Sequence, residues 1–297
     1  MTRARSLMQA GTSDPLLDLL HPRRLTAIVD IGANPIDCDP PYKDMLAQGL
    51  CTVIGFEPQL EALAKLEQNK GPRERYLPYA IGDGREHTLH VCQERGMTSL
   101  LAPDRERLSL FNGFPLFGVV ERKQKTRTHR LDEVREIDAM DYLKIDIQGG
   151  ELDAMKHGRR LLRNAVVVQT EVSFIPLYRD QPPLGAIDTF LRTMGFIPHC
   201  FSELKIRPLA PMVVEGDPTR GIHQLLEADL VYVRDFTKPE GMGGEQWKHL
   251  ALIAHHCYHS PDLALHAVRM AAHLSAIPPD APECYLKLLA DSKVPAM

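Results

Sequence analysis

Two short segments near the N-terminus constrain the fold more than any other part of the chain. Residues 27–34 read Ala-Ile-Val-Asp-Ile-Gly-Ala-Asn, an apolar strand that runs into a glycine turn, and residues 53–58 read Val-Ile-Gly-Phe-Glu-Pro, a strand that ends in a carboxylate. Glycine has no side chain, so such a turn lets the backbone approach a ligand closely. In doubly wound α/β folds an acidic residue about 20 positions beyond this turn accepts hydrogen bonds from ribose hydroxyls, and Glu57 lies 25 positions beyond Gly32. The spacing predicts a pocket for a cofactor that contains adenosine.

The residues after Gly32 narrow the choice of cofactor. They continue Ala-Asn-Pro-Ile-Asp and lack the second and third glycines of the dinucleotide fingerprint. Those glycines let the backbone approach a pyrophosphate and let the helix pack closely on the strand. Their absence favours a cofactor without a pyrophosphate, such as S-adenosylmethionine. A purely structural role is the alternative, in which Gly32 only makes a tight turn and Glu57 only caps the helix that begins near Pro58.

Two later segments repeat the pattern of a buried strand followed by a polar turn. Residues 142–152 read Tyr-Leu-Lys-Ile-Asp-Ile-Gln-Gly-Gly-Glu-Leu, and residues 166–174 form the next strand. With the first two segments and a strand at 228–234, they resemble the successive motifs of the FkbM-type S-adenosylmethionine-dependent methyltransferases. The resemblance covers about residues 25–236 and is carried by Asp30–Asn34, Gly55–Pro58, Lys144–Gly149, Glu171–Val172 with Pro176–Tyr178, and Ala228–Arg234.

This resemblance implies a fold, a cofactor and a reaction. The expected fold class is α/β, with the Rossmann-like sheet of class I methyltransferases, mostly parallel with an antiparallel last strand, plus a small helical C-terminal extension. The implied cofactor is S-adenosylmethionine, and the usual methyl acceptor is a hydroxyl oxygen, on sugars and natural products among others. The expected organisation is an N-terminal segment at 1–24, the methyltransferase domain at 25–236, a linker at 237–244 and the helical extension at 245–297.

Turn residues and apolar runs predict the order of elements within this framework. We expect sheet strands at 26–31, 51–56, 76–81, 119–131, 142–147, 165–171, 196–201 and 229–233, and a hairpin strand at 87–92. The expected helices lie at 42–49, 59–69 and 184–194, after an amphipathic entry segment at 15–20, and an insertion with Pro208, Pro211 and Gly216 separates the last two strands. Pro35, Pro40 and Pro41 depart from the family pattern, so we expect a stiff loop over 34–40 and a first domain helix that begins near Pro41.

The cofactor is expected at the carboxyl ends of the strands, because ligands of open α/β sheets bind there. The resemblance adds an acidic residue after the third strand, near the adenine. The expected cofactor-binding residues are Asp30, Gly32, Asn34, Glu57, Ile81, Asp83 and Asp146.

Asp146 is also the leading catalytic candidate, because it ends a buried strand beside the expected switch point of the sheet. Its carboxylate could take the proton of an acceptor hydroxyl, or it could cap the following helix and orient the amino group of the cofactor. Glu171 and His129 are the further catalytic candidates. Asp146 and Glu171 on neighbouring strand ends would also suit Mg²⁺, but two acids fall short of an octahedral ligand set, so we assign no metal. Lys144 is expected to pair with a nearby acid or to reach solvent.

The composition is that of an ordinary globular protein, with 297 residues, 44% hydrophobic residues and a net charge of −4. No strongly basic balance points to nucleic acid. The basic run at 122–130 is interpreted as a solvated strand face, with attraction of an acidic or phosphorylated acceptor as the alternative. Six scattered cysteines indicate reduced thiols. No signal-like segment and no run of about 18 apolar residues occurs, so we expect a cytoplasmic protein without a membrane span.

The segment after residue 245 is rich in leucine and histidine. Its apolar spacing predicts two or three amphipathic helices, which we expect to form a homodimer contact or a lid because their apolar faces need a partner. His255 and His259 lie one helical turn apart, but no cysteine or carboxylate completes a metal-ligand set. We therefore interpret these histidines as surface or interface residues.

The most plausible function at this stage is methylation of a hydroxyl on a small-molecule or glycan acceptor. Two other classes of function stay open. The first is an NAD-dependent oxidoreductase, which shares the glycine turn and the ribose acid but needs the missing glycines. The second is a catalytically silent module that keeps the fold only for binding, because a fold alone does not define an activity.

Overall fold

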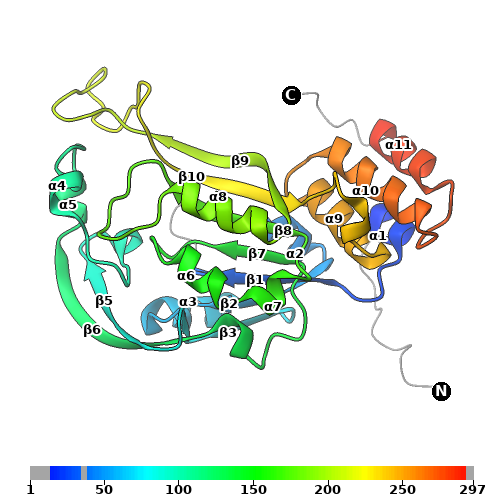
Figure 1. Cartoon of the computed structure of the whole chain (residues 1–297), viewed down its shortest axis with the longest axis horizontal. Helices are drawn as coiled ribbons and strands as arrows, with labels where there is room; N and C mark the ends of the chain where they lie inside the picture. Colours follow the sequence, from blue (N-terminus) through cyan, green and yellow to red (C-terminus); the bar gives the residue numbers. More distant parts are fainter. Residues whose placement is uncertain (1–13, 35–38, 292–297) are drawn as a thin grey trace. The chain divides into compact units, whose positions relative to one another are not determined.

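The computed structural model describes residues 14–34 and 39–291, and its larger sheet has seven strands (Figure 1). The strands of this sheet are β1 (Thr26–Ile31), β2 (Cys51–Phe56), β3 (Glu74–Leu77), β7 (Tyr142–Ile145), β8 (Val167–Ser173), β9 (Phe196–Ile206) and β10 (Leu225–Arg234). Their spatial order is β3-β2-β1-β7-β8-β10-β9. The pairs β2–β3, β1–β7 and β7–β8 are parallel, whereas β10 runs antiparallel to both of its neighbours. This topology confirms the predicted α/β fold class.

The described residues divide into two units. The sheet unit comprises Ala27–Asp39 and Val53–Gly241, and the helical unit comprises the described parts of Met1–Thr26, Pro40–Thr52 and Met242–Met297. The structure thus groups an N-terminal helix and the segment before β2 with the C-terminal helices, a grouping that the sequence did not lead us to expect.

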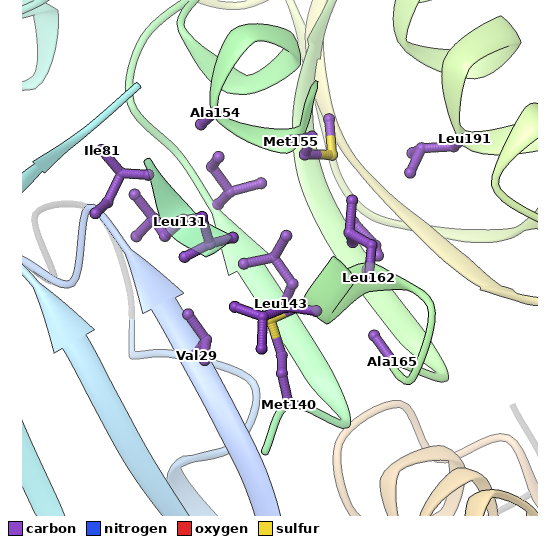
Figure 2. Packing of buried hydrophobic residues seen from close by; sticks show 14 of the residues in the cluster. Val29, Ile81, Leu131, Met140, Leu143, Ala154, Met155, Leu162, Ala165 and Leu191 are labelled. Carbon is purple, nitrogen blue, oxygen red and sulfur yellow. The ribbon is translucent and has the colours of Figure 1, made fainter. Parts of the chain in front are cut away.

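Three helices of the sheet unit pack on one face of the sheet. The helices of this unit that follow strands of the main sheet are α3 (Leu60–Asn69), α6 (Glu151–Lys156), α7 (Arg159–Leu162) and α8 (Leu184–Thr193). Apolar side chains of α6, α7 and α8 share one buried cluster with alternate residues of β1, β7 and β8. Figure 2 shows Met155, Leu162 and Leu191 of these helices around Leu143, with Val29 on the neighbouring strand. Every residue of β8 is buried, including the polar side chains of Gln169, Thr170 and Glu171, as expected for a central strand that is covered on both faces.

The predicted third strand, residues 76–81, is wrong as a single element. It divides into β3, which pairs with β2, and β4 (Ala80–Ile81), which pairs with a strand outside the main sheet. Pro78 lies between the two parts and has no amide hydrogen, so it cannot donate to a strand ladder. The apolar run continues through the proline, but the hydrogen bonding does not.

The predicted strand at 119–131 also lies outside the main sheet. It forms β6 (Val120–His129), which pairs antiparallel with β5 (Glu86–Cys92) and parallel with β4 in a separate three-stranded sheet. The hairpin strand at 87–92 is confirmed by β5. Most of β6 is exposed, as predicted for a solvated strand. The remaining short helices of the sheet unit are η1 (Arg95–Met97), α4 (Arg105–Leu108), α5 (Phe114–Phe117), η2 (Leu131–Glu133) and η3 (Pro239–Gly241).

The last two strands, β9 and β10, are longer than expected. The prediction ended the first at residue 201 and began the second at residue 229, whereas the pairing of β10 with β9 extends from Phe196↔Arg234 to Leu225↔Ile206. The insertion between them is therefore shorter than predicted. Exposed polar residues in the added part of β9 hid its strand character, because they break the apolar pattern.

The helical unit contains five helices within the described residues. They are α1 (Pro15–Leu20), α2 (Lys43–Ala47), α9 (Gly244–His256), α10 (Pro261–His273) and α11 (Ala281–Asp291). α9 packs on α10, α10 on α11, and α1 on both α9 and α11. Asp14 caps α1 by accepting a hydrogen bond from the Leu17 amide at 2.7 Å. α2 begins two residues after Pro41, and the predicted loop at 34–40 lies partly outside the described residues, at 35–38.

This packing corrects two interpretations of the C-terminal segment. The apolar faces of α9 and α10 are buried within the helical unit, so they already have partners and the stated reason for a dimer or lid no longer applies. The homodimer itself stays a prediction. His249 is also a core residue, 1% exposed, with its Nδ1 atom 3.1 Å from the Thr26 hydroxyl, rather than a surface histidine.

Two further observations concern the chain as a whole. In the part of the chain that the structure describes, no helix has the length and apolar content needed to cross a membrane. The described cysteines are free thiols: Cys51, Cys92, Cys200, Cys257 and Cys284. Cys38 lies outside the described residues.

Candidate active site

The carboxyl ends of β1 and β7 meet where the strand order reverses. The chain runs outward from β1 to β2 and β3 and then returns to β7 on the other side of β1. Ligands of open α/β sheets bind at such a topological switch point. The Asp146 amide donates to the Ile31 carbonyl oxygen at 3.0 Å. A Cβ atom on Gly32, whose φ is +82°, would lie 1.9 Å from the Asp146 carbonyl oxygen, so only glycine fits at this position.

A hydrogen-bonded cluster of polar side chains lies at the ends of β7 and β8. The side-chain amide nitrogen of Gln148 donates to Oδ1 of Asp146 at 2.9 Å and to Oε1 of Glu171 at 3.4 Å. Asp146 directly follows β7, and Glu171 belongs to β8. The structure therefore brings together the first two catalytic candidates of the sequence, and a single amide contacts both of their carboxyl groups.

Gln148 is itself held firmly in an uncommon conformation. Its φ is +58°, a left-handed value that non-glycine residues seldom adopt. The Tyr178 hydroxyl donates to the side-chain oxygen of Gln148 at 3.1 Å, and the Ser99 hydroxyl donates to its carbonyl oxygen at 2.7 Å. Sparsely populated backbone conformations concentrate at functional sites, where the surroundings enforce them. The conformation of Gln148 is thus a second observation, besides the carboxyl cluster, that marks this place.

Two buried glutamates lie close to Asp146 and favour their protonated forms. Glu151 accepts hydrogen bonds from the Ile147 and Gly149 amides, both at 3.0 Å. Burial raises the pKa of Glu151 to about 7, although these hydrogen bonds oppose the rise. Burial also raises the pKa of Glu171 well above its usual value, and the neighbouring carboxylates raise it further.

A lysine and a tyrosine complete the electrostatics of the cluster. Lys205 Nζ lies 3.1 Å from Glu227 Oε1. Burial lowers the pKa of Lys205, but the carboxylates of Glu227 and Glu171 outweigh burial and raise it, so the lysine stays charged. Burial and the nearby Glu171 raise the pKa of Tyr178, which keeps its hydroxyl protonated and able to donate to Gln148.

Glu57 directly follows β2, as expected for an acid that binds ribose. It is 4% exposed, and its Oε1 atom accepts a hydrogen bond from the Gln59 amide at 2.7 Å. Burial raises the pKa of Glu57, and the Gln59 hydrogen bond lowers it in part. Over residues 14–34 and 39–291, Oε2 of Glu57 has no protein hydrogen-bond partner. The Gln59 contact stabilises the turn before α3, so the capping role that the sequence left open is also present.

Asp30 is placed differently from Glu57. It is 1% exposed, and its Oδ1 atom lies 3.4 Å from Nζ of Lys144, its partner in the β1–β7 register. Burial lowers the pKa of Lys144, but the carboxylates of Asp30, Asp146 and Asp229 outweigh burial and raise it. The expectation that Lys144 pairs with a nearby acid is confirmed. The Asp30 carboxylate thus has a cationic partner within the sheet.

The remaining predicted residues contact other parts of the sheet unit rather than the carboxyl cluster. Asp83 accepts hydrogen bonds from His87 Nε2, the Arg85 amide and the Thr128 hydroxyl at 2.8–3.2 Å. Burial alone would raise the pKa of Asp83, but these hydrogen bonds lower it to about 2. These contacts fix the turn between β4 and β5. Ile81 is buried in β4, and the His129 ring stacks on Tyr79 with centroids 4.3 Å apart. Asn34 is half-buried at the edge of the described residues.

Four residues of the cluster were not among the predicted site residues: Ser99, Gln148, Glu151 and Tyr178. Gln148 and Tyr178 occur within the motifs that carried the resemblance, but no pattern in the sequence distinguishes them from structural polar residues. A signal for Glu151 was present, because an acid that directly follows a strand-end glycine turn can accept the amides of that turn. The contact between Ser99 and Gln148 joins positions 49 residues apart, which local patterns do not register.

The cluster also has some features of a metal site. Asp146, Glu151 and Glu171 each offer a carboxylate oxygen within 4.8 Å of the others, and no further group of this kind occurs in the described ranges. Hard cations such as Mg²⁺ favour oxygen ligands of this type. However, Oε1 of Glu151 already accepts two backbone amides, so this donor set fits a cation poorly. His255, considered earlier as a ligand, instead lies 3.0 Å from the Tyr285 hydroxyl.

The strand order β3-β2-β1-β7-β8-β10-β9, with β10 antiparallel to both of its neighbours, is that of the class I methyltransferase fold. The model of the methyltransferase FkbM domain matches residues 30–198, more than half of the chain. The chain therefore belongs to the FkbM methyltransferase family. This membership confirms the resemblance stated from the motifs and makes the protein an S-adenosylmethionine-dependent methyltransferase.

Individual relatives are more distant. The 2-O-methyltransferase NoeI of Sinorhizobium fredii is 27% identical over 202 residues, which are 64% of this chain and 76% of NoeI. Magnesium protoporphyrin IX methyltransferase (ChlM) of Synechocystis PCC 6803, solved with S-adenosylmethionine, shares 12% identity over 71% of this chain and 70% of its own, with a TM-score of 0.35. Human methyltransferase-like protein 13 in complex with S-adenosylhomocysteine shares 11% identity over 87% and 86%, also with a TM-score of 0.35.

Proposed function

We propose that this protein methylates a hydroxyl oxygen on a carbohydrate or natural product. The observation that carries the proposal is the Asp146 carboxyl group, placed at the switch point of the sheet and oriented by Gln148. The similarity to NoeI, which is named a 2-O-methyltransferase, supports oxygen as the methyl acceptor. The resemblance to a family that methylates sugars and natural products supports the acceptor class.

The residues at the ends of β1 and β2 fit the cofactor. Glu57 has one oxygen fixed by the Gln59 amide, and its other oxygen has no partner in the part of the chain that the structure describes, which suits the hydroxyls of a ribose. The turn at Gly32 brings backbone, rather than a side chain, to the switch point. When bound, S-adenosylmethionine supplies an activated methyl group on a sulfonium sulfur.

Because the methyl group is already activated, the protein must mainly align the acceptor and remove its proton. Alignment of reacting groups can lower a barrier by several kcal/mol, up to roughly 10. A positioned base adds about 100-fold or more. Asp146 is the base in this proposal, because burial and charge keep the neighbouring Glu171 protonated. Gln148 orients both carboxyl groups through its one amide.

The direct test measures S-adenosylhomocysteine release with a panel of hydroxyl-bearing acceptors. We expect release with a sugar or polyol acceptor, and thermal stabilisation by S-adenosylhomocysteine but not by NAD. Stabilisation by NAD alone would favour the oxidoreductase. Binding of S-adenosylhomocysteine without methyl transfer to any acceptor would favour the silent binding module.

A divalent cation is the second candidate for activating the acceptor, because Asp146, Glu151 and Glu171 share one site. We expect activity to survive chelation, since Glu151 is engaged by backbone amides. Loss of activity on chelation, restored by added Mg²⁺, would replace the proton-abstraction proposal with a metal-assisted one.

A further inference from the structure

A pocket of about 510 Å³ on the sheet unit collects positive charge. Its walls come from β5, β6, the segment before α4 and the segment after Tyr178. Four cationic side chains line it: Arg105, Arg122, Lys123 and Arg179. We call it the cationic pocket. It contains the first two residues of the basic run at 122–130, Arg122 and Lys123.

These four cations are not neutralised by the protein. Within residues 14–34 and 39–291, none of the four side chains forms an ion pair or a hydrogen bond. The acid in the lining, Glu121, lies 3.1 Å from Arg95 Nη2, which balances its charge. By contrast, Lys125 on the same strand already pairs with Glu86 at 3.4 Å. Uncompensated positive charge in a concave site attracts anions.

The strand geometry explains why neighbouring residues of β6 share this lining. Val91 pairs with Arg122 and Cys92 pairs with Val120, so Glu121 is the extra residue of a β-bulge. A bulge bends its strand and redirects side chains. It therefore accounts for Glu121, Arg122 and Lys123 all reaching one pocket, although successive residues of a regular strand point to opposite faces.

The cationic pocket is connected to the carboxyl cluster by short contacts. His90, in its wall, exchanges backbone hydrogen bonds with Ser99, whose hydroxyl holds Gln148. Arg179 donates its amide to the Ala102 carbonyl oxygen at 2.9 Å, and it directly follows Tyr178, which donates to the Gln148 side chain. Two residues of the pocket wall, His90 and Arg179, are therefore linked through the backbone to the residues that hold Gln148.

The chemistry of the lining selects one kind of anion. No aromatic side chain other than the His90 imidazole lines the cationic pocket, so it lacks the stacking surfaces that nucleic-acid bases use. Three guanidinium groups favour an oxyanion that accepts paired hydrogen bonds, and phosphate has this geometry. We propose that the cationic pocket binds a phosphoryl group carried by the methyl acceptor. The identity of the carrier rests on the proposed function, whereas phosphoryl binding does not.

Binding is tested first without any methyl transfer. Isothermal titration calorimetry with inorganic phosphate is expected to give a saturable heat for the wild type. The double variant Arg122→Gln/Lys123→Gln should bind roughly 10-fold or more weakly, because charged hydrogen bonds are lost. Lys125→Gln/Arg127→Gln removes the same charge from the same strand outside the pocket and should bind like the wild type. No saturable binding, or equal losses in both double variants, would overturn the proposal.

His90 provides a local signature of occupancy. Burial and the nearby Lys123 lower the pKa of His90, and a bound anion would raise it by favourable charge interaction. Histidine NMR titration should show this rise with phosphate in the wild type and in the control variant, but not in Arg122→Gln/Lys123→Gln. If phosphate leaves the pKa of His90 unchanged in the wild type, the anion binds elsewhere and the assignment is overturned.

The link to the acceptor is tested with glucose and glucose 6-phosphate as simple carriers. Glucose 6-phosphate should bind at least as tightly as inorganic phosphate, and glucose should not bind. The acceptor assignment would be overturned if a single-stranded homopolymer, or vesicles containing phosphatidic acid, bound more tightly than glucose 6-phosphate and lost affinity in the double variant to the same extent. With an identified phosphorylated acceptor, the double variant should raise KM and leave kcat nearly unchanged. If the wild type binds phosphate but transfers no methyl group to any acceptor, the proposed function is refuted and the proposal of phosphoryl binding stands.

Discussion

At the end of β2 a single carboxyl group, Glu57, accepts one backbone hydrogen bond, and its other oxygen has no hydrogen-bond partner among the described residues. At the ends of β7 and β8 three carboxyl groups lie within 4.8 Å of one another, and one glutamine amide contacts two of them. The first arrangement suits an uncharged diol, which needs only an acceptor. The second forces neighbouring acids to differ in protonation, because like charges at short distance raise the pKa of at least one of them. The comparison shows that two carboxyl sites on one sheet edge differ in charge environment, and we propose that the first binds the cofactor and the second handles the acceptor proton.

The largest expected effect is at Asp146. Asp146→Asn keeps the shape of the side chain but removes its basicity, so turnover should fall by about 100-fold or more with cofactor affinity nearly unchanged. Steady-state kinetics and calorimetry with S-adenosylhomocysteine measure the two effects separately. The exposed Asp153→Asn on α6 is the matched control and should behave like the wild type.

The outcome for Asp146 also decides between its two predicted roles. Weaker cofactor binding as the first defect would make Asp146 a cofactor ligand, as the sequence left open. If Asp146→Asn shows the turnover and the cofactor affinity of the wild type, Asp146 has neither role. The proposed functional difference between Asp146 and Glu57 would then be wrong.

The next largest effect is at Glu57. Glu57→Gln keeps an oxygen for the Gln59 amide but replaces the charged acceptor, so affinity for S-adenosylhomocysteine should fall roughly 10-fold or more. Turnover at saturating cofactor should change little, which is the opposite pattern to Asp146→Asn. Glu61→Gln, an exposed change on α3, is the control. Unchanged affinity in folded Glu57→Gln protein would show that the carboxylate serves only the turn before α3.

A smaller loss is expected at Gln148. Gln148→Asn retains an amide and tolerates the left-handed φ of +58°, but its shorter side chain no longer reaches both carboxyl groups. Turnover should fall about 10-fold, with cofactor affinity intact, because the orientation of Asp146 is relaxed. Tyr178→Phe removes only the hydroxyl that donates to Gln148 and should give a weaker version of the same defect. If both variants have the turnover of the wild type, the hydrogen bonds of Gln148 do not orient Asp146 for catalysis.

The smallest effect concerns the stability of the fold. The pKa of Glu151 is raised from 4.5 to about 7, so its protonated form contributes stability that is fully present below pH 4.5 and lost as pH rises through 7. Glu151→Gln keeps the oxygen for the Ile147 and Gly149 amides. Between pH 5 and 8 its free energy of unfolding should fall less than that of the wild type, by on the order of 1 kcal/mol. Urea unfolding across this range measures the difference. Parallel pH curves for Glu151→Gln, Glu133→Gln and wild type would contradict the prediction.

The sequence predicted the strands of the main sheet best where they are buried on both faces. β7 and β8 each begin with apolar residues flanked by turn signals, and the turn after β7 has its own glycines, so both the elements and the position of Asp146 follow from local pattern. The strand at 76–81 was mispredicted because hydropathy does not register the missing amide of Pro78. The second sheet was assigned to the first because exposed strands show no core-facing pattern, as in β6.

The candidate site was predicted only as far as strand ends could indicate it. Asp146 and Glu171 were chosen because parallel strands bring their carboxyl ends to one edge. The contacts of Gln148 with Tyr178 and Ser99 depend on how two distant segments fold over that edge, and no local rule predicts them. Asp83 and His129 have the right residue types, but they follow or belong to strands of the second sheet.

The contact between Gly32 and the Asp146 carbonyl oxygen has a consequence for how this enzyme can diversify. The turn expected to meet the cofactor and the backbone of the expected base are packed against each other without room for one additional carbon atom. Close packing therefore suppresses relative motion of the Gly32 turn and the Asp146 backbone. The entropy cost of aligning these two segments is met when the chain folds rather than when substrates bind. The segments between β5 and β6 and between β9 and β10 are separate from this contact in sequence. We therefore expect that substitutions in those segments can change the acceptor without altering the packed contact between Gly32 and Asp146.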